Sequence, residues 1–136
     1  MTGALFLDSS GWFAALSPPE RMHSAARLAY QRAVTEGLSL VTTDLVVAEM
    51  HALLLRWRDQ STGARFLDLV YRTGTHVVIH ADDALIGDAL THWISRFTDH
   101  RFTLCDAVSF EVMRRERITT ALALDRHFAT AGYRTL

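Results

Sequence analysis

The chain has 136 residues, the length of one domain, and we expect a single domain spanning residues 1–136. Hydrophobic residues make up 49% of it and charged residues 21%, which excludes an intrinsically disordered polypeptide. The net charge of −1 argues against a strongly basic nucleic-acid binder. All 14 basic residues are Arg, so a side-chain cation that contacts phosphate must be Arg or protonated His.

Two further features bear on where the protein acts. No apolar run approaches the roughly 20 residues of a membrane helix, and no basic region followed by an apolar stretch opens the chain. Cys105 is the only cysteine, so no intrachain disulfide can form, as is usual in a reducing cytosol. We therefore expect a cytoplasmic protein without a membrane partner.

Taken in order, the predicted elements alternate between strands and helices. The first half contains a buried strand at 5–7, helices at 10–16 and 20–36, a strand at 38–41 and a helix at 45–59. The second half contains a helix at 61–72, a strand at 76–80, helices at 83–97 and 103–116, a strand at 119–124, a short helix from 125 and an edge strand at 133–136. This alternation predicts a three-layer α/β/α fold with a central, mainly parallel sheet of four to five strands.

Two aspartates follow predicted strands. Asp8 comes directly after the strand at 5–7, and Asp125 directly after the strand at 119–124. Ligands of open α/β sheets bind at the carboxyl ends of the strands, so both carboxylates are candidates for chemistry. The alternative for Asp8 is that it only caps the helix that follows.

Two more acidic residues lie on predicted helices. Thr103 and Asp106 match the pattern of a helix start, which by itself explains Asp106 as a cap, although the side chain also points inward if this helix packs on the sheet. Glu49 falls within the apolar stripe of the helix at 45–59, where a carboxylate is costly unless it is paired or binds a metal. The alternative is a Glu at the edge of the stripe that extends into solvent, or one that pairs with an Arg such as Arg56.

Basic and His residues are less informative. Arg114, Arg115 and Arg117 crowd the end of the helix at 103–116, where positive charge suits the helix dipole, and phosphate binding is the alternative. The chain shows no zinc-ligand spacing, and we expect surface or structural roles for a set of four histidines: His76, His80, His92 and His100.

The four acidic residues can converge at the carboxyl edge of the sheet: Asp8, Glu49, Asp106 and Asp125. Carboxylates gathered there repel one another, so protons or a cation must neutralise them. Oxygen ligands, with no Cys or His expected among them, favour Mg²⁺ or Mn²⁺ over Zn²⁺. Such an ion could bridge the acidic edge to a phosphodiester and assist its hydrolysis.

Several segments resemble PIN-domain ribonucleases, and most closely the VapC-type toxins of bacterial toxin–antitoxin pairs. They are Leu7-Asp8-Ser9-Ser10, Val47-Ala48-Glu49, residues 103–110, and residues 123–128 followed by Gly132-Tyr133. Their order and spacing cover essentially the whole chain. The resemblance implies a catalytic metal site built from Asp8, Glu49, Asp106 and Asp125, with Thr103 as a supporting polar residue. We further expect Arg126 and Ser9 to contact the scissile phosphate.

The resemblance further implies Mg²⁺- or Mn²⁺-dependent hydrolysis of RNA, with transfer or ribosomal RNA as frequent targets, homodimers, and a cognate antitoxin that docks over the site. A housekeeping RNA-processing nuclease and an inactive module that binds RNA or protein are the alternatives. A phosphatase of the haloacid dehalogenase type needs a second Asp where Ser10 stands. A receiver domain needs a Lys, and the chain has none.

Overall fold

The computed structural model describes residues 3–136, and a five-stranded sheet forms its centre. The strands are β1 (Ala4–Leu7), β2 (Ser39–Thr43), β3 (Val77–Ile79), β4 (Thr120–Leu122) and β5 (Arg134–Thr135). All neighbouring strands pair in parallel, in the order β3-β2-β1-β4-β5. The predicted class is therefore confirmed, with five strands and a fully parallel sheet.

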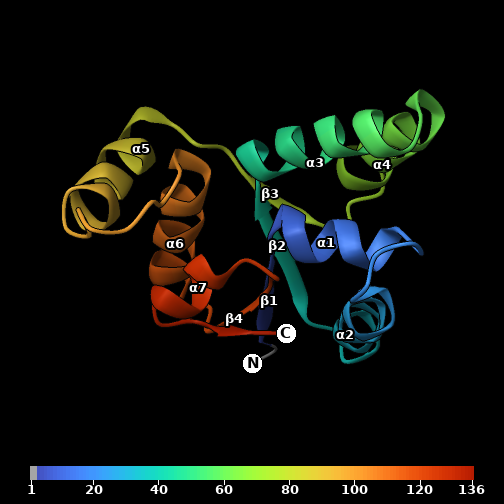
Figure 1. Ribbon diagram of the computed structural model, residues 1–136, viewed down its shortest axis with the longest axis horizontal. Helices are drawn as coiled ribbons and strands as arrows, with labels where there is room; N and C mark the ends of the chain where they lie inside the picture. The colour runs from blue at the N-terminus through green and yellow to red at the C-terminus, as the bar shows by residue number, and fades with distance from the viewer. Residues whose placement is uncertain (1–2) are drawn as a thin grey trace.

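Helices cover both faces of the sheet (Figure 1). One layer contains α1 (Ser9–Leu16), α2 (His23–Thr35), α3 (Asp44–Trp57) and α4 (Gln60–Arg72). The other contains α5 (Asp83–Ala89), α6 (Leu104–Glu116) and α7 (Arg126–Thr130). None of the helices within residues 3–136 is long and apolar enough to cross a bilayer.

Helix α6 is the most deeply buried helix of its layer. Eight consecutive residues from Asp106 to Met113 are buried, because the helix lies between the sheet on one side and α5 and α7 on the other. Phe110 anchors it, with its ring edge-on to Phe128 at 4.9 Å and to Phe102 at 5.0 Å. Polar residues on α6 are thus held in fixed positions by the surrounding aromatic core.

The strand order reverses between β1 and β4, which places a crevice at their carboxyl ends. The Asp8 amide donates to the Leu122 carbonyl at 3.1 Å, so the end of β1 is fastened to the end of β4. Gly11 in α1 makes this closeness possible, because a Cβ there would press on the Leu122 carbonyl and lie 2.8 Å from the Ala123 nitrogen.

One predicted helix differs from the structure. The stretch 83–97 was expected to be one α-helix, but α5 ends at Ala89 and the π-helical segment η1 (Leu90–Ile94) follows. In η1 the adjacent side chains of His92 and Trp93 both reach Glu111 of α6, which the regular α-helical spacing gives no reason to expect. The strand expected at 119–124 is also shorter, ending at Leu122.

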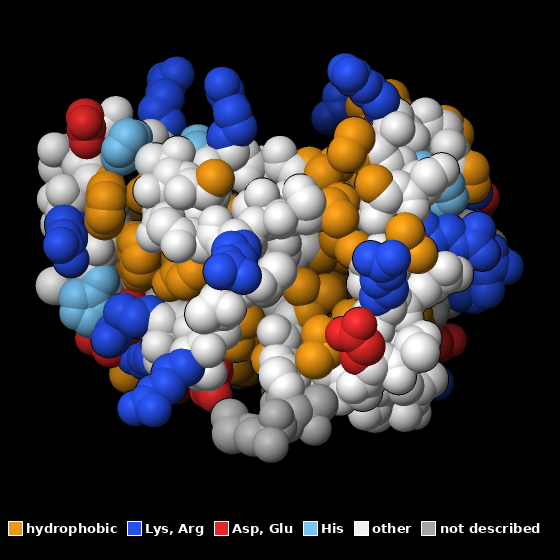
Figure 2. All heavy atoms as spheres, turned by 90° about the horizontal axis from the view of Figure 1, so that it is seen from below, with side chains coloured by type: hydrophobic (Ala, Val, Ile, Leu, Met, Phe, Trp, Pro, Cys, Tyr) orange, Lys and Arg blue, Asp and Glu red, His pale blue; other side chains and the backbone are white. Residues whose placement is uncertain are grey.

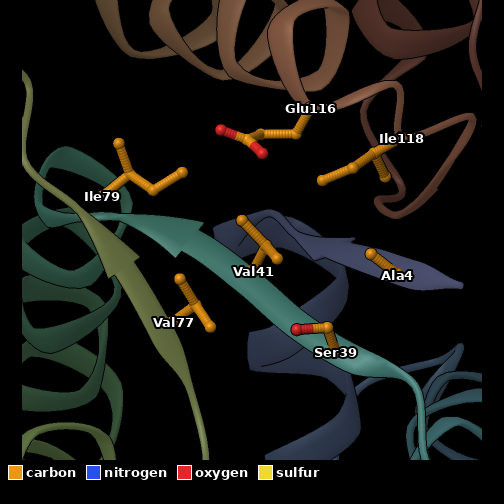
Figure 3. A pocket seen from close by; sticks show the side chains of 7 residues that line it. All are labelled: Ala4, Ser39, Val41, Val77, Ile79, Glu116 and Ile118. Atoms are coloured by element: carbon orange, nitrogen blue, oxygen red, sulfur yellow. The ribbon is translucent and has the colours of Figure 1, made fainter. Parts of the chain in front are cut away.

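The sheet is not fully covered on the side of α6. An apolar groove of about 370 Å³ runs over β2 and β3 beside the end of α6, and Figure 3 shows its lining: Ala4, Ser39, Val41, Val77, Ile79, Glu116 and Ile118. The view from below in Figure 2 likewise shows hydrophobic side chains exposed along the middle of the molecule, with Arg side chains around them. None of the predicted site residues lines this groove.

Candidate active site

Asp8 lies at the end of β1, where it is 4% exposed and caps α1. Its Oδ2 accepts hydrogen bonds from the Ser10 amide at 3.2 Å and the Ser10 hydroxyl at 2.5 Å. Burial raises the pKa of Asp8 to about 6; the Ser10 hydrogen bonds lower it, and the charges of Glu49 and Asp106 raise it further. Asp8 therefore caps α1, as the alternative expected, and it also lies near two other carboxylates.

Ser10 connects the ends of the two central strands. Its hydroxyl donates to Asp8 and accepts hydrogen bonds from the amides of Leu124 at 3.0 Å and Asp125 at 3.3 Å. This fixes the spacing between the two strand-end aspartates. No local pattern in the sequence indicates this role of Ser10, because these two amides lie more than 100 residues away along the chain.

Glu49 reaches the same crevice from α3, but from an exposed position. The expected place on the buried face is wrong, because the buried residues of α3 are Val46, Val47, Met50 and Leu54, which lie on a different side of the helix. The exposure of Glu49 agrees with the alternative of a Glu that extends into solvent, whereas a pairing with Arg56 is absent among the described residues. Instead, the buried Ser9 hydroxyl donates to Glu49 Oε1, which aims the carboxylate toward Asp8.

Asp106 combines a capping role with a place in the acidic cluster. It forms a capping box with Thr103, whose amide donates to Asp106 Oδ2 at 3.0 Å. The same Oδ2 lies 2.8 Å from His127 Nδ1. Asp106 is 6% exposed, and among the described residues both of these bonds use one oxygen, so Oδ1 stays free for a ligand.

His127 joins Asp106 to Asp125. Asp125 caps α7 by accepting from the His127 amide at 2.9 Å, and its Oδ1 lies 3.5 Å from His127 Nδ1. Ligand atoms of Asp106, Asp125 and His127 all lie within 4.8 Å of one another. The expectation that no His or Cys stands among the carboxylates is therefore wrong. Cys105 is also close, since burial and then the charges of Glu49, Asp8 and Asp106 raise the pKa of its thiol.

The remaining predicted residues lie at the border of this cluster. Thr103 caps α6 and holds Asp106. Arg126 is the first residue of α7, directly after Asp125, and its side chain is exposed. No signal in the sequence pointed to His127, because its partner Asp106 lies 21 residues away on another helix.

The arrangement suits a hard divalent cation. Within residues 3–136 the hydrogen-bond donors to the four carboxylates are hydroxyls, backbone amides and one imidazole, and no Arg pairs with any of them. The raised pKa of Asp8 shows how unfavourable its buried negative charge is without a counter-ion. Carboxylate oxygens are the ligands that Mg²⁺ and Mn²⁺ prefer, so the donor set fits such an ion.

No family model matches the chain, but one curated protein and several solved structures resemble it over nearly its full length. The chain is 26% identical over 129 residues to the 23S rRNA-specific endonuclease VapC20 of Mycobacterium tuberculosis, and the match covers 95% of each protein. The crystal structure of that VapC20, described as a sarcin–ricin loop cleaving toxin, matches with a TM-score of 0.83 over 96% of both chains.

More distant structures share the fold alone. VapBC2 from Rickettsia felis, solved with a promoter DNA fragment, gives a TM-score of 0.69 at 10% identity and covers 98% of this chain and 97% of that one. FitAcB from Neisseria gonorrhoeae gives 0.66 at 11% identity, covering 97% and 96%. The motifs, the fold and the full-length likeness to VapC20 therefore agree with the resemblance to PIN-domain proteins of the VapC type.

Proposed function

We propose that the chain is a Mg²⁺- or Mn²⁺-dependent ribonuclease that acts as the toxin of a toxin–antitoxin pair. One observation carries this proposal: carboxylates from β1, α3, α6 and the β4–α7 junction converge at the strand-order reversal without an Arg to neutralise them among the described residues. The endonuclease activity of VapC20, 26% identical over nearly the full length, supports RNA as the substrate.

Each residue of the cluster has a proposed task. Asp8 and Asp106 hold the ion most directly, and Asp125 and Glu49 complete its surroundings or accept a proton from the attacking water. A bound divalent ion would supply positive charge to the phosphodiester oxygens and lower the pKa of the attacking water. His127 and Thr103 fix the Asp106 carboxylate, while Ser9 fixes Glu49.

Substrate contact falls to groups at the border of the cluster. Arg126 is exposed beside Asp125, and a guanidinium can hold a phosphate through two parallel hydrogen bonds. We assign it to the scissile phosphate. Ser9 remains a candidate contact, although its hydroxyl already donates to Glu49.

The proposed partners follow the same likeness. We propose a cognate antitoxin that covers the acidic cluster, and a homodimer as the active form. VapBC2 of R. felis, whose fold the chain shares, was solved bound to promoter DNA, and VapC20 is described as cleaving the sarcin–ricin loop of rRNA. Ribosomal RNA is therefore the first substrate to test.

The test is cleavage of 23S rRNA by the purified chain with Mg²⁺, with Mn²⁺ and with chelator. Asp8→Asn and Asp106→Asn remove proposed ligands, whereas Asp68→Asn removes an exposed carboxylate that pairs with Arg72 on α4 and serves as the matched control. We expect metal-dependent cutting by the wild type and the control only. Cutting that survives both ligand substitutions would reject the site, and metal binding without any cutting of rRNA, tRNA or mixed RNA would favour an inactive binding module.

A further inference from the structure

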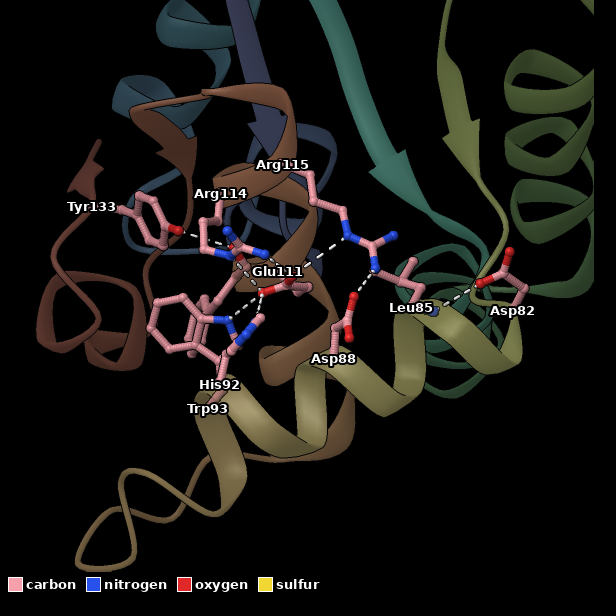
Figure 4. Close-up of polar contacts among 10 residues, drawn as sticks. Asp82, Leu85, Asp88, His92, Trp93, Glu111, Arg114, Arg115 and Tyr133 are labelled. Atoms are coloured by element: carbon pink, nitrogen blue, oxygen red, sulfur yellow. Dashed lines mark hydrogen bonds and ion pairs between the residues drawn. The ribbon is translucent and has the colours of Figure 1, made fainter.

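A second polar cluster, separate from the acidic one, surrounds Glu111 on α6. Glu111 is fully buried, and Figure 4 shows side chains from η1 and α6 converging on it. Trp93 Nε1 donates at 3.1 Å and His92 Nδ1 lies at 3.0 Å from Oε1, while Arg114 binds through Nε at 3.0 Å and Nη2 at 2.6 Å. The proposed nuclease reaction uses none of these groups.

Two side chains of this cluster, Arg114 and His92, contact Glu111 on one side and solvent on the other. The Arg114 side chain is 51% exposed and the His92 side chain 40% exposed, although each contacts the buried Glu111. Arg114 uses Nε and Nη2 for Glu111, which leaves Nη1 for another acceptor. Glu111 thus orients these two side chains, much as a carboxylate behind a metal site orients the side chains that bind the metal.

A cleft of about 460 Å³ opens where these side chains meet solvent. Its lining consists of His92, Trp93, Arg96, Phe97, Arg114 and Ala131. Arg96 lies over the Phe97 ring at 5.7 Å, and none of the lining residues is acidic. The cleft therefore presents the guanidinium groups of Arg96 and Arg114 to solvent, and Glu111 pairs with Arg114 from beneath.

The cleft lies within reach of a nucleic acid bound at the acidic cluster. Arg114 follows Asp106 by eight residues on α6, or about 12 Å along the helix axis. A row of aromatic contacts links the two places, from Phe97 to Phe102 at 5.6 Å between ring centroids and from Phe102 to His127 at 5.4 Å. A chain of a few nucleotides can span this distance.

We infer that this cleft is a second contact site for the RNA substrate, in which Arg96, Arg114 and His92 bind a backbone phosphate some nucleotides away from the scissile bond. The inference rests on the proposed ribonuclease function and extends it. Trp93 is only 8% exposed, so the site offers charge and hydrogen bonds rather than a platform for base stacking. It gives a chain of net charge −1 a local basic surface for a polyanion.

Arg96 is the residue to change, because it makes no hydrogen bond or ion pair among the described residues and its loss should not disturb the fold. Arg27→Gln is the matched control, since Arg27 is another exposed Arg, on α2 in the other helix layer. Binding is measured in the Asp8→Asn background, so that the RNA stays intact. The probe is a fluorescein-labelled RNA hairpin with the sarcin–ricin loop sequence, titrated at several salt concentrations.

We expect Arg96→Gln to weaken binding about 3- to 10-fold, Arg96→Glu to weaken it more, and Arg27→Gln to change nothing. The slope of log affinity against log salt should fall by about 0.7 to 0.9 for the lost phosphate contact. In cleavage assays without the Asp8 substitution, KM should rise more than kcat falls.

Two results separate the inference from the proposed function. If the wild type cuts RNA with metal but Arg96→Gln and Arg96→Glu bind and cut as Arg27→Gln does, the cleft is not an RNA site and only the inference fails. The inference also fails alone if the Arg96 variants lose affinity for an antitoxin and keep their affinity for RNA. If the wild type neither binds nor cuts RNA, the proposed function fails and the inference with it.

Discussion

Among single residues, Asp8 makes the clearest stability prediction. The pKa of Asp8 in the folded state is about 6, which is above the ordinary value for Asp, so folding favours the protonated form. Above pH 6 the side chain is ionised, and its buried charge then lowers the free energy of unfolding by on the order of 3 kcal/mol. Without metal at pH 7, Asp8→Asn should therefore raise Tm, because Asn keeps the cap and removes the charge. The gain should vanish below about pH 4, where Asp8 is protonated in both states.

Thermal unfolding in chelator at pH 7 and at a pH below 4 measures this difference. Asp68→Asn, the exposed control on α4, should leave Tm nearly unchanged at both values. A lower Tm for Asp8→Asn at pH 7 would show that the buried carboxylate is already compensated by the protein and would weaken the case for a bound cation.

Gly11 makes a second prediction at this scale. A methyl group there meets the backbone of Leu122 and Ala123, so Gly11→Ala should lower the free energy of unfolding by about 1–3 kcal/mol and push β4 away from β1. Gly87→Ala is the matched control, because Gly87 lies inside α5 with open space around it and Ala favours helix by about 1 kcal/mol. Chemical denaturation should show opposite signs for the two variants, and equal signs would contradict the close approach.

The site residues were predictable from sequence to different degrees. Asp8 and Asp125 follow apolar runs, and Asp106 lies in a helix-start pattern, so local spacing was enough to find them. Glu49 was selected because its position was expected to be buried, whereas the structure leaves it exposed, so its selection rested on a wrong reason. His127 was missed, since only the packing of α7 on α6 brings it to Asp106.

At the scale of elements, the pairing of α6 with η1 depends on Glu111. Burial alone would raise the pKa of Glu111. Hydrogen bonds from Arg114, His92 and Trp93 outweigh this effect and lower the pKa to about 2. A lowered folded pKa stabilises the protein above the ordinary Glu value of about 4.3 and loses this effect as pH falls toward 2. Glu111→Gln should thus lower the free energy of unfolding by about 3–5 kcal/mol at pH 6 and by much less near pH 2.

Urea unfolding at both pH values measures this effect, with Glu116→Gln at the exposed end of α6 as the control. An equal loss at both pH values would mean that shape, and not charge, makes Glu111 important. The same pairing explains why η1 was not predicted. Apolar periodicity in the sequence indicates only a regular α-helix. In the structure the neighbouring residues His92 and Trp93 both bind the buried Glu111 carboxylate, and they do so from the wider turn of a π-helix.

For the molecule as a whole, the alternation of elements was enough to predict the α/β class, and the parallel crossovers then place helices on both faces. The sequence also predicted that the strand-end aspartates share one edge. It did not predict the two surfaces formed by several elements together, the apolar groove over β2 and β3 and the basic cleft between η1 and α6. Those surfaces depend on side chains whose neighbours are distant in the chain.

The central claim is that the converging carboxylates act together as one divalent-cation site that drives RNA cleavage. The most direct test titrates Mn²⁺ into the wild-type chain and follows, in the same samples, Mn²⁺ binding by electron paramagnetic resonance and the rate of 23S rRNA cleavage. We expect the two curves to share one midpoint, and Asp8→Asn and Asp106→Asn to lose both signals while Asp68→Asn keeps both. Full cleavage in chelator, or Mn²⁺ binding unchanged in both ligand variants, would contradict the account.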